Sequence, residues 1–207
     1  MSLPPYLPES RLPAGLADLL PATPPAPWTC RVRAVLWVQR APSPLPSSSP
    51  LAGRVRPWAV GAFVDYLDSP VGPYREVLLG QLVRGSALPV LHVPFIAVDS
   101  LASVAGGREH WLLPKTLGRF TGTSATGEDW HVGAEPRAYG PRFPVRGPLR
   151  TDQGSGRFTT RLHGSARLAR VDVTTAGLTL GPWLGSGVRP GLIAEGTVTV
   201  GAPPPRP

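Results

Sequence analysis

Residues 58–98 read WAVGAFVDYLDSPVGPYREVLLGQLVRGSALPVLHVPFIAV and contain three apolar runs separated by turn residues. The runs are rich in the β-branched and aromatic residues that strands favour. They span 58–66, 74–83 and 90–98. Residues 68–73 are rich in turn formers, so the first two runs are expected to pair as a hairpin. Pro94 lies within the third run and indicates an edge or a bulge there.

The β pattern continues outward in both directions. Upstream, Trp28–Arg40 alternates between two faces and predicts a strand, and a low-complexity loop follows at 41–50. Downstream, Asp99 or Ser100 can cap a short helix over Leu101–Ala105, and residues 106–120 lack a strand pattern. Further strands are expected at 121–123, 130–132, 156–163, 166–174 and 196–200. Many strands and few short helices predict a mainly β fold, either a barrel or a sandwich.

Proline is concentrated near the two ends of the chain. The sequence holds 28 prolines and 24 glycines among 207 residues, a level at which disorder has to be considered. Because the prolines crowd the first fifty residues and the last five, we expect disorder only at the ends. We therefore predict an N-terminal arm at 1–27, in which Leu16–Leu20 makes one helical turn. A single domain follows at 28–201, with a tail at 202–207.

The chain is strongly basic, with a formal net charge of +8 and 21 lysine and arginine residues. A nucleic-acid-binding protein would show this charge, and it would be retained on DNA or RNA with a steep dependence on salt. The arginines, however, are spread among prolines, glycines and strand residues, without zinc-finger spacing or a basic helix. We therefore expect a solvated basic face and no nucleic-acid partner.

The only cysteine, Cys30, excludes an intramolecular disulfide and fits a reducing compartment. We expect Cys30 to be a small buried residue. No signal-peptide pattern and no long apolar run is seen, so we expect a cytoplasmic protein without membrane attachment. The histidines lack the spacing of metal ligands, and no phosphate-binding loop is present, so neither a metal nor a cofactor is expected.

Lys115 is the only lysine among the 21 basic residues. It follows Pro114, and tryptophan and leucine residues surround it, so its side chain is expected to lie in an apolar environment. An unperturbed lysine has a pKa of about 10.4, and burial can lower it by about three to five pH units. A lysine that loses its proton near neutrality is a nucleophile, whereas an arginine cannot form an imine. Lys115 is therefore the candidate nucleophile, although such a residue in an ordinary sequence would be a surface lysine.

Two stretches carry a family resemblance. GREHWLLPKTLG at 107–118 resembles the signature of the acetoacetate decarboxylase-like family, in which a Gly-Arg-Glu triplet leads to a Pro-Lys pair. PYREVLLG at 73–80 is similar to that family's Tyr-x-Glu segment. The resemblance is best over about 58–122. It implies an antiparallel, cone-like β-barrel that forms homo-oligomers and acts on a small keto acid without metal or dissociable cofactor.

The resemblance also assigns roles to residues. It implies that Lys115 forms a Schiff base with the ketone of a β-keto acid, and that Glu76 is an acid of the same pocket. An arginine of the first strand, Arg31 or Arg33, is implied to lie near that acid. Further candidates for substrate contacts are Tyr74, Arg108, Glu109, His110 and Trp111. Arg108 and Glu109 can also form an ion pair that holds the Lys115 loop, and His110 can relay a proton.

Two departures separate this chain from decarboxylases of the family. Thr116 stands where they carry a second lysine, and Val60–Val64 offers no additional glutamate, the nearest acid being Asp65. Desolvation alone would then have to lower the pKa of Lys115. Three interpretations remain: a lyase that decarboxylates a β-keto acid, a related lysine-dependent aldolase or dehydratase, and a β-barrel binding protein that has kept the scaffold without turnover.

Overall fold

The computed structural model describes residues 7–40, 51–84, 90–154, 156–177 and 180–203. The expected loop at 41–50 lies outside the described residues. Strands dominate the described part, and no helix in these ranges has the length and apolar character that a membrane crossing requires.

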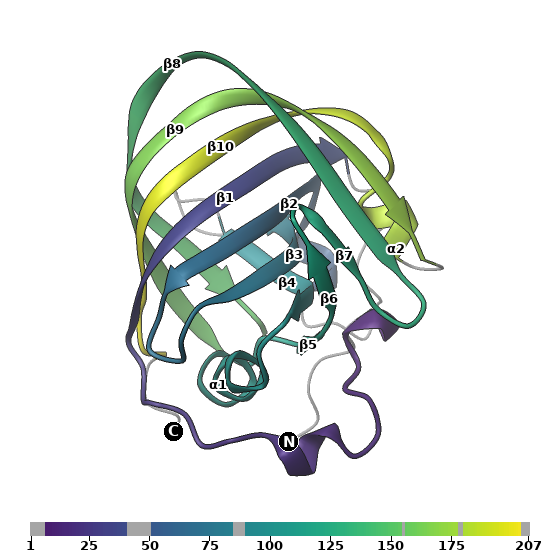
Figure 1. Ribbon diagram of the computed structural model, residues 1–207, viewed down its shortest axis with the longest axis vertical. Coiled ribbons are helices and arrows are strands. Elements are labelled where there is room, and N and C mark those ends of the chain that lie inside the picture. Colours follow the sequence, from purple (N-terminus) through teal and green to yellow (C-terminus); the bar gives the residue numbers. More distant parts are fainter. Residues whose placement is uncertain (1–6, 41–50, 85–89, 155, 178–179, 204–207) are drawn as a thin grey trace.

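Ten strands form one continuous sheet in the order β5-β4-β3-β2-β1-β10-β9-β8-β7-β6. A further pairing between β4 and β8 joins the sheet to itself, so that β4, β3, β2, β1, β10, β9 and β8 form a closed ring. The strands of the ring are β1 (Trp28–Arg40), β2 (Val55–Asp68), β3 (Tyr74–Val83), β4 (Val90–Val98), β8 (His131–Asp152), β9 (Arg157–Ala176) and β10 (Gly187–Val200). The strands outside the ring are β5 (Lys115–Leu117), β6 (Arg119–Thr121) and β7 (Ser124–Thr126). Figure 1 shows β8, β9, β10 and β1 arching side by side over one side of the molecule.

The predicted mainly β class is confirmed, but the sheet is mixed rather than antiparallel. Within the ring, β4 and β8 pair in parallel, and β5 also runs parallel to β4. The β5 strand corrects the expectation that residues 106–120 contain no strand. A three-residue strand is too short to show a periodic pattern, so only its pairing with β4 identifies it. The bulge expected at Pro94 is present, since the β3–β4 register shifts between Leu79 and Gln81.

Three strands are much longer than the sequence indicated: β8, β9 and β10, of which β10 begins at Gly187 instead of residue 196. β8 continues from the expected segment at 130–132 through to Asp152, although it contains four prolines: Pro136, Pro141, Pro144 and Pro148. These prolines lie where β8 pairs with β9 alone, because β7 pairs only up to Gly133 and β4 only at Arg150 and Thr151. A proline on such an open edge removes no ladder hydrogen bond. β9 likewise joins two expected strands into one.

The helix α1 (Leu101–Trp111) lies at one end of the ring next to β5 (Figure 1). Ser100 caps it, since its hydroxyl accepts the backbone N–H of Ser103 at 3.2 Å. The helix continues beyond the expected end at Ala105, through Gly106 and Gly107, and ends at Leu112 with a φ of 56°. Glycine is a poor helix former, but both glycines are buried, and packing overrides local propensity. A second short helix, α2 (Leu180–Trp183), lies near the end of β9.

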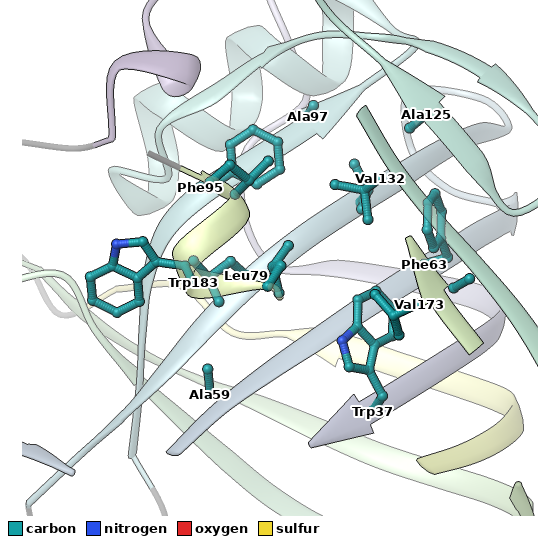
Figure 2. Packing of buried hydrophobic residues seen from close by; sticks show 14 of the residues in the cluster. Trp37, Ala59, Phe63, Leu79, Phe95, Ala97, Ala125, Val132, Val173 and Trp183 are labelled. Atoms are coloured by element: carbon teal, nitrogen blue, oxygen red, sulfur yellow. The ribbon is translucent and has the colours of Figure 1, made fainter. Parts of the chain in front are cut away.

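The main hydrophobic core packs against the outer face of β1–β4. Trp37 is fully buried there and contacts Phe63, at a ring-centroid distance of 6.2 Å. Figure 2 shows these rings together with Leu79, Phe95 and Val173. Gly61 makes room for the indole, because a Cβ at this position would lie 2.2 Å from the Trp37 ring. On β1, Val35 and Trp37 therefore point into this core, whereas the residues that alternate with them face the interior of the ring.

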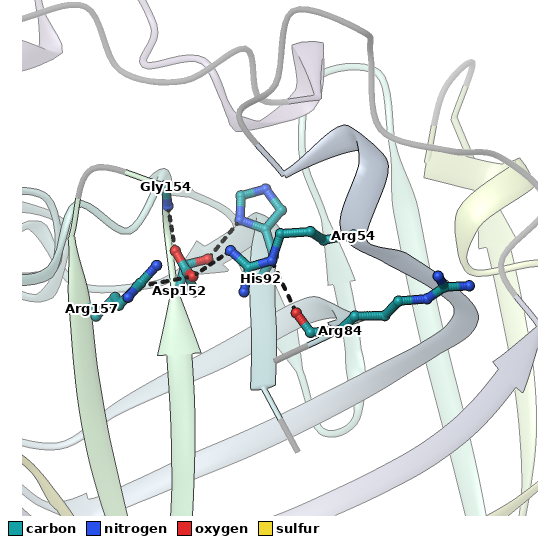
Figure 3. A network of polar contacts seen from close by, with 6 residues as sticks. All are labelled: Arg54, Arg84, His92, Asp152, Gly154 and Arg157. Carbon is teal, nitrogen blue, oxygen red and sulfur yellow. Dashed lines mark hydrogen bonds and ion pairs between the residues drawn. The ribbon is translucent and has the colours of Figure 1, made fainter. Parts of the chain in front are cut away.

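A polar cluster lies next to the parallel β4–β8 pairing that closes the ring (Figure 3). Asp152 is 2% exposed, and its carboxylate accepts hydrogen bonds from Arg54 and Arg157 at 3.1 Å each. It also accepts the backbone N–H of Gly154 at 2.9 Å. His92 of β4 lies 3.1 Å from the carbonyl oxygen of Asp152 through Nδ1. The Asp152 cluster thus ties the ends of two strands that are far apart in the sequence.

Residues 7–27 pack against the ring, which corrects the expectation of disorder for this part of the arm. They contain the short 3₁₀ helices η1 (Pro8–Ser10) and η2 (Leu16–Leu19), so the single turn expected at Leu16 is present. The Ser10 hydroxyl donates to the carbonyl of Pro94 at 2.9 Å, and Leu16 is buried. The prolines exclude long helices but allow an extended segment to lie along the barrel.

Candidate active site

A cavity of about 320 Å³ occupies the interior of the strand ring. All seven ring strands contribute to its wall, together with Trp111 at the end of α1. From β1 the wall receives the alternate residues Trp28, Cys30, Val32, Ala34 and Leu36. The wall is almost entirely apolar, and Lys115, Glu76, Tyr66 and Tyr74 gather at one place on it.

Lys115 begins β5, and three contacts fix its position. Its strand pairs with β4, where Ile96 is the partner of Lys115. Arg108 donates from Nε to the carbonyl oxygen of Lys115 at 2.6 Å and from its terminal nitrogen to the carbonyl of Ser10 at 2.9 Å. The side chain then passes over Gly107, where a Cβ would lie 2.5 Å from Cδ of Lys115. Gly107 therefore creates the path by which the lysine enters the cavity.

The Lys115 ammonium meets Glu76 inside the cavity wall. Nζ donates to the Glu76 carboxylate at 2.7 Å and to the Ser103 hydroxyl at 2.9 Å. The side chains of Lys115 and Glu76 are only 5% and 2% exposed. Glu76 points inward because it alternates along β3 with outward-facing residues. The candidate nucleophile Lys115 and the candidate acid Glu76 are thus in direct contact, although 39 positions separate them in the sequence.

Two tyrosines complete this group. Tyr66 donates from its hydroxyl to Glu76 at 3.1 Å, and its ring stacks on Tyr74 with the centroids 4.1 Å apart. Nζ of Lys115 lies 5.1 Å from the ring centroid of Tyr74 and 6.0 Å from that of Tyr66. Aromatic faces attract a cation at such distances. The two rings therefore stabilise the ammonium form, and Tyr66 holds the Glu76 carboxylate in place.

The pKa of Lys115 differs in direction from the sequence-based expectation. Burial is the largest single influence and lowers this pKa, but the Glu76 carboxylate at 2.7 Å and Tyr74 together raise it by more, so the pKa lies above its usual value of 10.5. Lys115 is therefore an ammonium ion in the resting site. Burial also raises the pKa of Tyr74 to about 12, which keeps its hydroxyl protonated. The pKa of Tyr66 is raised well above its usual value by burial and by the charge of Glu76.

Arg31 and Arg33 do not reach the cavity. Both are exposed on β1, where they alternate with the cavity-lining Cys30 and Val32. Because successive side chains of a strand point to opposite faces, neither arginine can turn inward without reversing the strand. The expectation that one of them contacts substrate is corrected by this register. Cys30 is buried as expected, and burial raises the pKa of its thiol to about 11.

The remaining candidates lie around α1. Trp111 forms part of the cavity wall, and its indole N–H donates to the carbonyl of Gly201 at 2.8 Å. His110 packs away from the cavity, with Nε2 3.0 Å from the Thr23 hydroxyl. Glu109 is exposed. Adjacent residues of a helix do not face each other, so Glu109 is poorly placed to pair with Arg108, which instead holds β5.

The structure supplies no replacement for the second lysine or for the additional glutamate that decarboxylases of the family carry. Val64 is the direct cross-strand partner of Glu76 on β2, so that position brings no second carboxylate, and Asp65 is exposed. Thr116 donates from its hydroxyl to the carbonyl of Arg11 at 2.9 Å, away from the amine. Among the described residues, no three His, Cys, Asp or Glu side chains come together in a way that could hold a metal.

Sequence reasoning missed three functional neighbours of Lys115. Tyr66 could have been found, because it flanks the same turn as Tyr74 and such positions pair in a hairpin. Ser103 and Gly107 share one side of α1, four positions apart, but their closeness to Lys115 depends on how the chain turns back after Leu112. Nothing in the local sequence specifies that turn.

The chain was compared with protein-family models, curated sequences and solved structures. The family model described as acetoacetate decarboxylase (ADC) matches residues 41–182. No curated protein sequence gives a significant match. Acetoacetate decarboxylase from Legionella pneumophila is similar in structure, with a TM-score of 0.56, 16% identity, and coverage of 88% of this chain and 87% of that one.

Two further solved structures share the fold. The enduracididine biosynthesis enzyme MppR with HEPES bound has a TM-score of 0.53 and 13% identity, and 87% of each chain is covered. An acetoacetate decarboxylase-like enzyme from Sphingomonas wittichii RW1 has a TM-score of 0.54 and 12% identity, with 86% of this chain and 90% of that one covered. At such identities the likeness concerns the fold.

Proposed function

Since this chain belongs to the acetoacetate decarboxylase family, we propose that it is a lyase in which Lys115 forms a Schiff base with a β-keto acid. The observation that carries the proposal is the 2.7 Å contact between Lys115 and Glu76 inside an apolar cavity. A buried lysine paired with a buried carboxylate costs desolvation energy, so a purely structural role is a poor reason to keep such a pair.

The first step requires a neutral amine. Glu76 takes a proton from the Lys115 ammonium along their hydrogen bond, and the freed amine attacks the ketone carbon of the substrate. The attacked oxygen takes one proton from the nitrogen and becomes a hydroxyl. Glu76 then returns its own proton to this hydroxyl, so that water leaves and a protonated imine remains. Low polarity favours this exchange, since transfer of the proton converts two buried charges into two neutral groups.

The second step uses the imine as an electron sink. The bond between the α-carbon and the carboxylate breaks, carbon dioxide leaves, and its electron pair forms an enamine while the imine nitrogen becomes neutral. Protonation of the enamine at carbon restores the imine, and water hydrolyses it to the ketone and Lys115. Tyr66 and Tyr74 keep their protons and cannot serve as bases near neutral pH, and Tyr66 orients Glu76 through its hydrogen bond.

A lysine-dependent aldolase or dehydratase is the second candidate. Val64 opposite Glu76 leaves the site with one carboxylate, which favours chemistry that needs a single acid–base group. The similar fold of MppR, which has been solved in complex with pyruvate, makes another keto acid a reasonable substrate. Both candidates share imine formation on Lys115 and diverge only afterwards.

Borohydride trapping tests the shared step. We expect acetoacetate or pyruvate plus borohydride to add one reduced adduct to the chain, located by mass spectrometry on the peptide that contains Lys115. The Lys115→Arg variant should give none. Because Lys115 is the only lysine, labelling at other lysines cannot confuse the result. Absence of an adduct across a panel of small keto acids would leave a binding protein as the better interpretation.

We also propose that the working form is a homo-oligomer. Tyr139 of β8 and Leu168 of β9 are cross-strand partners, and they are 48% and 45% exposed. An exposed aromatic–aliphatic pair of this kind supports burial against another surface. Light scattering on the purified protein will give the assembly size, and a monomer at all concentrations would refute this expectation.

A further inference from the structure

The cavity extends well beyond the amine. Its wall includes every second residue of β1 from Trp28 to Leu36, a stretch about 26 Å long at roughly 3.3 Å per residue. It has the volume of roughly ten water molecules at about 30 Å³ each. A four-carbon keto acid at Lys115 would leave most of this apolar wall in contact with water, which is unfavourable.

A pair of glycines helps to keep the cavity open beside the reactive group. Gly164 and Gly196 are direct partners across β9 and β10, and the same row continues through Val32 to Tyr66. A Cβ at Gly164 would lie 2.1 Å from the carbonyl oxygen of Glu195, so the close approach of the backbones excludes a side chain. The cavity wall therefore carries no side chain at these two positions, which lie beyond Val32 on the row that ends at Tyr66.

The charged residues of the cavity wall limit the number of charged groups that a bound ligand can have. Among the described lining residues, the buried charges are those of Lys115 and Glu76, which neutralise each other. Glu195 also borders the cavity, but it is exposed and bonded to Arg142 on the outside. The imine nitrogen is formed from Lys115, so its single positive charge has to serve both Glu76 and the carboxylate of a bound keto acid. A second anionic group would be buried without a partner, at a high cost in desolvation.

Building on the Schiff-base function above, we propose that the substrate is a 3-oxo acid with an uncharged apolar chain longer than the methyl group of acetoacetate. The ketone carbon bonds to Lys115, the carboxylate lies near the positive imine nitrogen, and the alkyl chain of the substrate runs past Tyr66 along the inner face of β1. The product after decarboxylation is the methyl ketone with the same chain. Each additional buried methylene should tighten binding about fourfold.

Quenching of tryptophan fluorescence gives a direct test on the unaltered protein, since Trp28 and Trp111 line the cavity. We will compare 2-alkanones from acetone to 2-nonanone, and 1-alkanols of the same lengths, which cannot form an imine. The dissociation constant should fall about fourfold per methylene until the cavity is full. If the affinity does not change with the length of the alkyl chain in the 2-alkanones or in the 1-alkanols, the proposed substrate class is wrong.

A matched pair of variants tests where the alkyl chain of the ligand lies in the cavity. Ala34→Phe adds a ring on the inner face of β1, whereas Ala138→Phe adds the same ring on an exposed part of β8. The first should end the gain in affinity at a shorter chain, and the second should leave the whole series unchanged. Equal effects of both variants, or none from Ala34→Phe, would contradict the proposed path.

The test separates this inference from the Schiff-base function. Suppose that borohydride labels Lys115 with acetoacetate, but the length of the alkyl chain does not change the dissociation constant. The Schiff-base function is then supported and the proposed substrate class is wrong. If alkanols and alkanones bind with the expected dependence but no adduct forms, the cavity takes an apolar ligand and the chemistry at Lys115 fails.

Discussion

Two buried carboxylates in this protein have similar burial and different surroundings. Glu76 and Asp152 are both 2% exposed, and both bind cationic side chains. The partner of Glu76 is Lys115, itself 5% exposed and adjoining an apolar cavity. The partners of Asp152 are Arg54 and Arg157, whose side chains are 36% and 70% exposed. Both members of the Lys115–Glu76 pair are therefore excluded from water, whereas the arginine partners of Asp152 are in contact with it.

The difference separates a site suited to chemistry from one suited to stability. Arginine keeps its proton at any ordinary pH, so the Asp152 carboxylate cannot take a proton from Arg54 or Arg157. A lysine and a carboxylate in an apolar wall can do so, and a ligand can reach them from the cavity. Burial of a carboxylate is therefore weak evidence of function, whereas the identity and access of its cation are informative.

Glu76→Gln should have the largest effect. Loss of the acid–base group should slow the exchange of α-hydrogens of a bound ketone in D₂O by roughly 10²–10⁴-fold, the usual contribution of such a group. Nuclear magnetic resonance of the ketone in D₂O measures this exchange without knowledge of the natural substrate. An exchange rate equal to that of the original protein would remove Glu76 from the mechanism.

The same variant should also lower the pKa of Lys115. In the original protein Glu76 and Tyr74 together outweigh burial, so the pKa lies above 10.5. With a neutral glutamine, burial is opposed by Tyr74 alone, so the pKa of Lys115 falls. Titration of the single lysine by ¹⁵N nuclear magnetic resonance will show the direction of this change, and an unchanged pKa would mean that the ion pair is absent in solution.

Gly107→Ala should disturb Lys115 without removing a functional group. The added methyl would lie 2.5 Å from Cδ of Lys115, so the lysine or α1 has to move. Such overpacking costs about 1–3 kcal/mol, and we expect borohydride trapping to slow about tenfold to a hundredfold. Gly53→Ala is the matched control, since a Cβ there meets no atom within 4 Å. Equal trapping by both variants would refute the proposed path of the side chain.

Asp152→Asn should affect stability and leave the reaction unchanged. The amide keeps the volume but loses charge-assisted hydrogen bonds to two arginines, so we expect a loss of about 1.5–3 kcal/mol in the free energy of unfolding. Urea denaturation measures this loss. Borohydride trapping at a temperature where the variant is folded should match that of the original protein, and a tenfold decrease there would show that the two clusters are coupled.

The smallest effect concerns pH and His92 in the Asp152 cluster. Burial lowers the pKa of His92 below its usual 6.5, so the unfolded chain binds a proton more readily than the folded one. This contribution to stability is complete above pH 6.5 and decreases as the pH falls towards the folded-state pKa, by at most about 1.4 kcal/mol per pH unit. His92→Asn keeps a donor near the position of Nδ1 and should flatten the dependence between pH 7.5 and 5, about the range in which histidine titrates. Identical slopes in urea titrations would contradict this assignment.

Local patterns predicted the parts of the fold in which side chains alternate against a neighbouring strand. The strands from Trp28 to Arg40 and from 58 to 98 were found, since each has one apolar face over several residues. The length of β8 was missed, because its prolines are tolerated only on an edge that exists in the assembled sheet. The outward direction of Arg31 and Arg33 was missed as well, because a shift of one residue exchanges the two faces of a strand. The boundaries between arm, domain and tail stay predictions.

The sequence by itself determined that the protein is mainly β and that one lysine, in an apolar segment after Pro114, is the chemically exceptional cation. Both follow from residue type and spacing along the chain. Only the tertiary structure decided that Lys115 meets Glu76 and Tyr66, that the ammonium form is favoured, and that the cavity continues along β1. These properties depend on distances between strands far apart in sequence, and electrostatic energies follow distance and burial rather than order along the chain.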